Sequence, residues 1–205
     1  MATDVYTPGL RIVAADDDTI LDLDSLQGLW TEEQYLRLTG SSRRLLEFTD
    51  GSIEVLPMPT DRHQVISRFL FLALFQYVQR LGGTVLYAPL RLQIREGKFR
   101  EPDLLVVLDK SDPRRQNAYW LGADLVVEIV SPDDPERDTR VKRIDYAEAG
   151  IPEYWIVNPQ DETVTVLRLE GEQYAEHGLF RRGDMAASAL GAGFTVRVEE
   201  VFDAS

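Results

Sequence analysis

The sequence of 205 residues contains no cysteine. Disulfide bonds and thiolate metal sites are therefore excluded, and the chain fits a reducing compartment. Its N-terminus lacks the basic and apolar regions of a secretory signal peptide, and its longest apolar run, Phe69 to Phe75, is far too short to span a bilayer. We therefore expect a soluble, cytoplasmic protein that has no membrane partner.

Basic residues are outnumbered by acidic ones, 22 against 35, and the formal net charge is −13. A large excess of acid argues against a nucleic-acid partner, because phosphate binding normally needs a basic surface. The acids are concentrated at the two ends, however. Residues 1–35 hold eight acids against one base and residues 153–205 hold ten acids against four bases, so the segment between them is neutral.

Two local clusters of basic residues lie within this neutral segment. They are Arg91, Arg95, Lys98 and Arg100, and Arg137, Arg140, Lys142 and Arg143. Such clusters are compatible with a solvated face of mixed charge and also with a nucleic-acid surface. Charge alone leaves both interpretations open.

Hydrophobic residues make up 44% of the chain and charged residues 28%. This composition is sufficient for one sizeable core, and no repeat, low-complexity segment or convincing linker divides the chain. The first part of the sequence is rich in aspartate among scattered apolar residues. We expect an irregular acidic N-terminal arm over residues 1–28 and a single domain over residues 29–205.

Capping residues, turns and apolar patterns predict the secondary structure. Thr31 is a suitable N-cap for a short helix, Asp50-Gly51 provides the positive φ of a tight hairpin turn, and Gly82-Gly83 ends a long apolar helix. The apolar residues of the long helix cover more than one stripe, so we expect it to be buried on most sides. The expected helices are 32–38, 62–81 and 136–149, and the expected strands are 45–48, 52–56, 84–89, 91–95, 103–108, 125–130, 154–157, 163–169, 173–175 and 195–198.

Glu128 is a charged residue in a strand that is otherwise apolar on both faces. The apolar residues are Leu125, Val127 and Ile129 on one face and Val126 and Val130 on the other. Burial of an unpaired carboxylate costs several kcal/mol. Glu128 therefore needs a cation, a metal ion or a network of hydrogen bonds opposite it.

The neighbouring elements offer partners for Glu128. Asp103 opens the preceding central strand, so two carboxylates can meet at one edge of the sheet, where hard oxygen ligands suit Mg²⁺ or Mn²⁺. The helix 136–149 leads from Glu128 into the next strand through a short crossover, which predicts a parallel pair. On this helix Lys142 shares a stripe with Asp145, Tyr146 and Ala149. A lysine on that stripe can orient a water molecule or stabilise negative charge in a transition state.

Three features give the sequence a family resemblance. They are Glu101-Pro102-Asp103, the 25-residue step from Asp103 to Glu128, and the segment G-I-P-E-Y-W-I-V-N-P from Gly150 to Pro159. Together with the Ser131-Pro132 turn, they resemble the Uma-two family of endonucleases over about residues 30–170. This family is a branch of the restriction-endonuclease-like PD-(D/E)XK superfamily.

The resemblance implies an α/β fold with a restriction-endonuclease-like core, in which a central mixed β-sheet is flanked by helices. It also implies a metal-dependent hydrolase that cleaves phosphodiester bonds. Asp103 matches the PD aspartate and Glu128 matches the (D/E) residue, and both would be catalytic and bind the metal. The superfamily lysine is expected two residues after Glu128, where this sequence has Val130. In this family the lysine has moved to the following helix, which points to Lys142 as the catalytic lysine.

Two other polar residues are candidates for the same site. Glu54, in the predicted hairpin, would be an additional metal ligand or an exposed carboxylate. His63, in the first turn of the long helix, would contact phosphate or serve as a surface or capping residue. Tyr146 and Trp155 are expected to be core aromatics.

Two functions follow from these observations. The first is a Mg²⁺- or Mn²⁺-dependent endodeoxyribonuclease with DNA as its partner, acting as a homodimer in which two sites address two strands. The second is a non-catalytic nuclease-fold module for binding or regulation, in which Glu128 and Lys142 form only a structural ion pair. No recognition helix or base-reading motif indicates a sequence preference.

Overall fold

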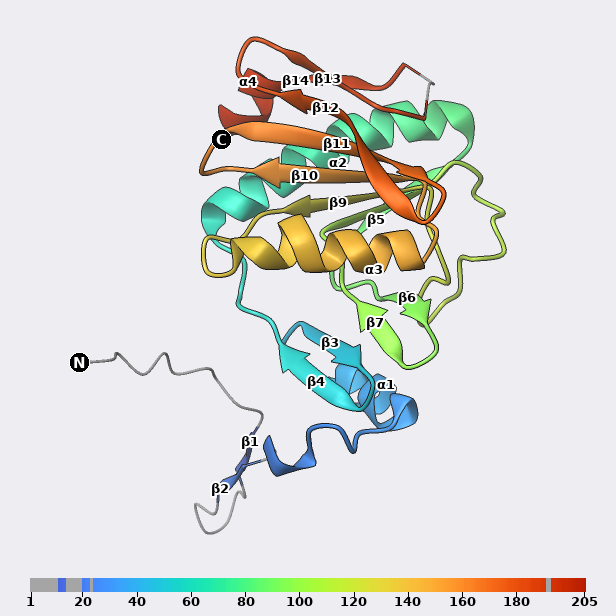
Figure 1. The fold of residues 1–205 in the computed structure, drawn as a ribbon, viewed down its shortest axis with the longest axis vertical. Helices are drawn as coiled ribbons and strands as arrows, with labels where there is room; N and C mark the ends of the chain where they lie inside the picture. Colours follow the sequence, from blue (N-terminus) through green and yellow to red (C-terminus); the bar gives the residue numbers. More distant parts are fainter. Residues whose placement is uncertain (1–10, 14–19, 23, 191–192) are drawn as a thin grey trace, which may run out of the picture. The chain divides into compact units, whose positions relative to one another are not determined.

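The computed structural model describes residues 11–13, 20–22, 24–190 and 193–205. They form two compact units, drawn as ribbons in Figure 1. The first unit comprises the described residues up to Met58 together with Gly97–Arg100, and the second comprises the described residues of Pro59–Glu96 and Glu101–Ser205. Most of the predicted acidic arm lies outside the described residues, and the boundaries of the arm and of the domain stay predictions. No helix in the described part is long and apolar enough to cross a membrane.

The first unit combines short antiparallel strands with two helical segments. Its strands are β1 (Arg11–Val13) paired with β2 (Ile20–Asp22), and β3 (Leu46–Thr49) paired with both β4 (Ser52–Val55) and β7 (Lys98–Arg100). Its helices are the 3₁₀ helix η1 (Asp24–Leu26) and α1 (Glu32–Ser41). Tyr35, Phe48 and Phe99 are buried together, and the rings of Tyr35 and Phe48 stack with centroids 5.1 Å apart.

The predicted cap and hairpin of this unit are confirmed. Thr31 caps α1 by accepting a hydrogen bond from Gln34 N, and the Gln34 side chain accepts one from Thr31 N. This reciprocal pair is a capping box, which fixes the start of the helix. Between β3 and β4, Asp50 and Gly51 have φ values of 46° and 85°, as a tight hairpin turn requires.

A six-stranded mixed sheet forms the centre of the second unit (Figure 1). The strand order is β12-β11-β10-β9-β8-β5, in which β9 and β10 run parallel and the other neighbours are antiparallel. The strands are β5 (Thr84–Tyr87), β8 (Leu104–Val107), β9 (Leu125–Ile129), β10 (Glu153–Asn158), β11 (Thr163–Glu170) and β12 (Gln173–Phe180). The other elements of the unit are α2 (Asp61–Leu81), β6 (Leu92–Arg95), η2 (Arg137–Val141), α3 (Lys142–Glu148), β13 (Met185–Ala187), β14 (Thr195–Arg197) and α4 (Val198–Phe202).

Helices cover both faces of this sheet, with α2 on one face and α3 on the other (Figure 1). Leu125, Val127 and Ile129 pack in the core that contains α2. Val126 and Val130 pack in the core that contains residues of α3. The predicted α/β class, the parallel pair and the alternation of apolar residues around Glu128 are all confirmed.

The prediction that the long helix α2 is buried on most sides was wrong. Its fully buried residues form one stripe, Ile66, Leu70, Leu74 and Val78. Leu72 and Phe75 on its outer side are 50% and 43% exposed. The number of apolar residues in a helix does not reveal how many layers cover it, and α2 packs on the sheet through one side.

The region after β9 also differs from the prediction of a single α-helix over residues 136–149. Arg137–Val141 forms a π-helical turn, and the regular α-helix is Lys142–Glu148. The strand predicted over residues 173–175 extends to Phe180, and β7, β13 and α4 were not predicted. These short elements contain too few residues for a periodic pattern to identify them.

Two adjacent glycines at the end of α2 test its packing against β8. Gly82 has a φ of +80°, but a Cβ there would meet no atom within 4 Å, whereas a Cβ on Gly83 would lie 2.3 Å from Val107 O. We expect Gly82→Ala to lower the free energy of unfolding by about 1 kcal/mol through backbone strain. Gly83→Ala should lower it by about 3 kcal/mol, because the backbone of β8 has to shift. Urea unfolding measures both variants, and equal losses would contradict this close approach.

Candidate active site

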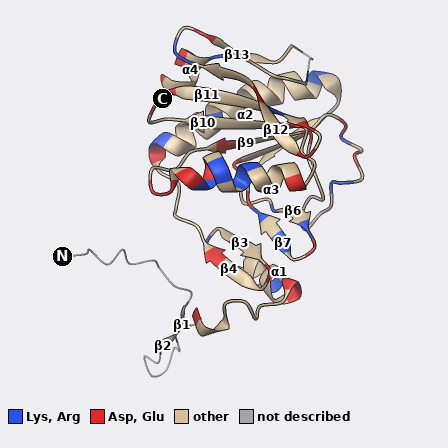
Figure 2. Cartoon of the chain, in the orientation of Figure 1, with Lys and Arg blue, Asp and Glu red and all other residues tan. Residues whose placement is uncertain are grey.

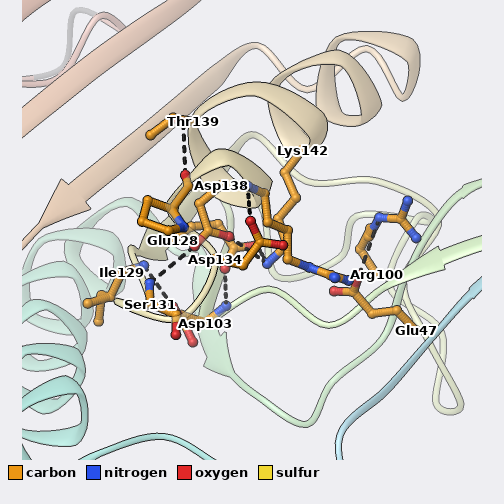
Figure 3. Close-up of polar contacts among 12 residues, drawn as sticks. Glu47, Arg100, Asp103, Glu128, Ile129, Ser131, Asp134, Asp138, Thr139 and Lys142 are labelled. Carbon is orange, nitrogen blue, oxygen red and sulfur yellow. Dashed lines mark hydrogen bonds and ion pairs between the residues drawn. The ribbon is translucent and has the colours of Figure 1, made fainter. Parts of the chain in front are cut away.

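Two neighbouring strands bring Asp103 and Glu128 together. β8 and β9 are antiparallel with Leu104 opposite Val127, so Asp103 comes next to Glu128. Asp103 N donates a 3.4 Å hydrogen bond to Glu128 Oε2, and Ile129 N donates a 2.7 Å hydrogen bond to Asp103 Oδ2. Backbone groups therefore hold both carboxylates at the same end of the two strands (Figure 3).

Lys142 reaches Glu128 from the helix on this face of the sheet. Its Nζ lies 2.8 Å from Glu128 Oε1 and 3.1 Å from Asp138 Oδ1. All three residues are buried, with no more than 4% of their surface exposed. The hydroxyl of Tyr146 in α3 donates to Glu128 Oε1 as well. Glu128 therefore has the cation and the hydrogen bonds that its burial requires.

A π-helical turn carries Asp138 into this cluster. Lys142 N donates to Arg137 O, five residues back in the chain, as in a π-helix. The hydroxyl of Tyr154 on β10 donates a 2.7 Å hydrogen bond to Asp138 O. A side chain of the neighbouring strand thus supports the widened turn.

His63 approaches Asp103 from the first turn of α2. Thr60 caps this helix by accepting a hydrogen bond from His63 N, which fixes the position of the histidine. His63 Nε2 lies 3.1 Å from Asp103 Oδ2, and the buried Nδ1 has no hydrogen-bond partner among the described residues. Burial lowers the pKa of His63, whereas the hydrogen bond and the charge of Asp103 raise it, and the net result is a raised pKa.

When all three of its acids are ionised, this cluster carries more negative than positive charge. Three carboxylates, those of Asp103, Glu128 and Asp138, are balanced by Lys142 and, when it is protonated, by His63. Burial raises the pKa of Glu128 to about 8, and the charges of Asp103 and Asp138 add to this rise while Lys142 opposes it. An additional cation beside these carboxylates would therefore be electrostatically favourable.

The donor set fits a hard divalent cation. Asp103 Oδ1 has no hydrogen bond to a described residue, and Glu128 Oε2 accepts only the long one from Asp103 N. Mg²⁺ usually takes one or two protein carboxylates and completes its shell with water. Across the described chain, no three His, Asp or Glu side chains are gathered as a ready-made ligand set. Two carboxylates are thus what the protein itself offers here.

The other sequence candidates lie in different environments. Glu54 is exposed on β4 in the first unit, and its role as an additional metal ligand stays a prediction. Val130 is buried in the apolar core on the α3 side, so the lysine position of the superfamily is filled by a core residue. Trp155 is buried, as expected of a core aromatic.

Sequence reasoning missed the part that Asp138 and Tyr146 take in the cluster. Tyr146 was expected to be a core aromatic, and it is buried, but its hydroxyl also bonds to Glu128. Asp138 could have been found by its spacing, because it lies four residues before Lys142 and i,i+4 residues are neighbours on a helix. His63 was considered, but its contact with Asp103 spans 40 residues and no local pattern indicates it.

Comparisons with known proteins give a matching family and a similar fold. A family model described as "Uma2: Putative restriction endonuclease" matches residues 32–199. The crystal structure of "a putative nuclease belonging to DUF820 from Anabaena variabilis ATCC 29413" is similar, with a TM-score of 0.69 and 20% sequence identity over 84% of this chain and 97% of that chain. At this level of identity the similarity shows a shared fold. A comparison with curated proteins found no match.

The contact between His63 and Asp103 is testable by NMR, because the chain has only one other histidine, His177. Asp103→Asn removes the hydrogen bond and the charge that contribute most to raising the pKa of His63, and it leaves burial, the largest effect, which lowers that pKa. We expect the pKa of His63 to fall below its ordinary value of 6.5, and the signals of the exposed His177 help to assign the spectrum. An unchanged His63 pKa in this variant would show that Asp103 does not face the ring.

Proposed function

The chain belongs to the Uma2 family, described as putative restriction endonucleases, and on this basis we propose that it is a metal-dependent endonuclease that hydrolyses phosphodiester bonds of DNA. The observation that carries the proposal is the cluster of Asp103, Glu128 and Lys142, in which acids outnumber bases. A purely structural ion pair would need one acid for one base. The additional carboxylates are consistent with a site for a divalent cation.

Each residue of the cluster has a distinct role in this proposal. Asp103 and Glu128 hold Mg²⁺ or Mn²⁺ through their carboxylate oxygens. When bound, such a cation supplies positive charge that polarises a phosphoryl oxygen and makes water a better nucleophile. Lys142, held between Glu128 and Asp138, keeps an ammonium group beside the carboxylates and stabilises the negative charge that develops on phosphate. His63 orients Asp103 through their 3.1 Å contact.

Cellular location and assembly form part of the same proposal. The chain has no cysteine, which fits the reducing cytoplasm. A homodimer would let two sites act on the two strands of a duplex. Light scattering on the purified protein measures its assembly directly.

A non-catalytic module of the same fold is the second candidate. Two observations favour it: Val130 takes the lysine position of the superfamily, and Lys142 is engaged in a buried pair with Glu128. In that case the protein would bind DNA or another partner without cleaving it. Activity measurements on site variants separate the two candidates.

We expect purified protein to cleave plasmid DNA in the presence of Mg²⁺ or Mn²⁺, and Lys142→Ala and Glu128→Ala to be impaired. The rate for Lys142→Ala should fall by about 100-fold, because the charge it stabilises in the transition state is left without its cation. The rate for Glu128→Ala should fall at least as far, because this substitution removes a carboxylate of the proposed metal site. Cleavage that persists undiminished in both variants would place the active site elsewhere.

A control for stability is needed, because removal of Lys142 leaves buried carboxylates without their partner, at a cost of about 3–5 kcal/mol. Arg114→Ala is a suitable control variant. Arg114 Nη2 pairs with Asp112 at 2.5 Å and with Asp124 at 2.6 Å, so the substitution removes two ion pairs of a separate cluster. We expect it to lower stability and to leave the cleavage rate of the folded protein unchanged. Circular dichroism verifies that each variant is folded.

Metal binding should depend on pH because the pKa of Glu128 is raised to about 8. Below this pKa the carboxyl group holds a proton that the cation has to displace. We expect the affinity for Mn²⁺ to fall by about tenfold for each pH unit below the pKa. Electron paramagnetic resonance of free Mn²⁺ measures this affinity at each pH. Glu128→Gln is the control, because it removes the carboxyl group that titrates. An affinity independent of pH would contradict the role of Glu128 as a ligand.

A further inference from the structure

A groove lies on the α3 side of the six-stranded sheet. It has a volume of about 430 Å³, and residues of η2, α3, β10, β11 and β12 line it. Its apolar residues are Ile156, Leu167 and Leu179, and its basic residues are Arg143 and Arg181. The groove is therefore apolar in part and positively charged in part, in a chain whose formal net charge is −13.

The groove lies beside the candidate active site on the same face of the sheet. Glu128 is the direct parallel neighbour of Ile156, Ile156 is opposite Thr165, and Thr165 is opposite Leu179. Directly paired residues of adjacent strands point to the same face of a sheet, and adjacent strands lie about 4.8 Å apart. One row of side chains thus leads from Glu128 on β9 to the groove residues Ile156, Thr165 and Leu179 on β10, β11 and β12. The groove therefore begins on the strand next to the one that carries Glu128.

The two arginines of the groove are able to accept an anionic ligand. The guanidinium of Arg181 has no hydrogen bond or ion pair with any described residue, and its side chain is exposed. Arg182, the next residue, is instead paired with Glu162 and Asp203. Arg143 donates one hydrogen bond of 2.6 Å to Tyr174 O, which orients it, and its other N–H groups have no acceptor among the residues that the structure describes.

The remaining groove residues suit a sugar–phosphate chain. Thr163 and Thr165 lie two residues apart on β11, so both hydroxyls face the groove. Hydroxyl groups and arginines are the side chains that commonly contact phosphate and sugar in DNA complexes. The acid of the lining, Asp161, is bonded to Asn158 Nδ2 at 2.9 Å and is outnumbered by the two arginines. Figure 2 shows basic residues, interspersed with acidic ones, along the helix beside the groove.

We propose that this groove binds the sugar–phosphate backbone of the DNA strand next to the scissile phosphate, with Arg181 and Arg143 as phosphate contacts. The inference rests on the proposed function, because the strand enters the groove from the site of Asp103, Glu128 and Lys142. Arg143 and Arg181 position the strand and do not take part in the chemical step. The groove thus supplies a local basic surface that the overall charge of the chain conceals.

Fluorescence anisotropy with labelled oligonucleotides in EDTA tests this inference without hydrolysis. One arm uses single-stranded DNA and the other uses a duplex, because both present the same backbone chemistry. We expect Arg181→Ala to weaken binding about tenfold and to reduce the slope of log affinity against log salt by about 1. Arg182→Ala is the matched control, because this adjacent arginine is paired with Glu162 and Asp203. The affinity of this variant for DNA should equal that of the wild type.

The outcomes separate this inference from the proposed function. A loss of affinity in Arg181→Ala but not in Arg182→Ala supports the groove, and the arm that shows it identifies the form of DNA bound. Equal affinities of the two variants, or no binding by the wild type, overturn it. Plasmid cleavage with equal affinities of the two variants refutes the groove alone. Binding that depends on Arg181 without any cleavage refutes the endonuclease and leaves the groove in place.

Discussion

The burial of Glu128 is the constraint on which the second unit depends. A carboxylate in a strand covered on both faces is tolerated only when charge and hydrogen bonds meet it from several sides. Lys142 and Tyr146 reach it from α3, and the backbone of Asp103 reaches it from the position just before β8. The helix must therefore lie over β9 in one register, and the widened turn before it keeps both Asp138 and Lys142 in the cluster.

The sequence predicts those parts of the fold that short-range rules control. The cap at Thr31, the turn at Asp50-Gly51 and the two faces around Glu128 need only neighbouring residues or a period of two. The exposure of one side of α2 and the π-helical turn before Lys142 depend on what packs nearby, which no periodic pattern contains. The same distinction applies to the candidate site. The pairing of Lys142 with Glu128 is predictable, because Glu128 lies in an apolar strand and Lys142 lies on the inward stripe of the helix that follows. The contact of His63 with Asp103 depends on tertiary structure.

The cluster around Glu128 contains more acidic groups than a simple ion pair. One lysine neutralises one glutamate, yet Asp138 contacts the same ammonium group and Asp103 lies beside the same glutamate. An excess of buried acid destabilises a protein unless something else compensates it. Clusters of buried charged residues are common at functional sites. The chain belongs to a family described as putative restriction endonucleases, and a cluster of acids is consistent with that description.

The π-helical turn and the parallel strand pair also affect how the chain folds. Tyr146 is 18 residues from Glu128 in the sequence, and Asp138 and Lys142 lie between them, so most partners of the buried charge belong to one strand–helix–strand segment. A contact between residues that are near in sequence forms a short loop. The loss of chain entropy is then smaller, and the contact is favoured to form early in folding. The local sequence therefore favours the covering of Glu128 by its own segment ahead of the contact between His63 and Asp103, which spans 40 residues.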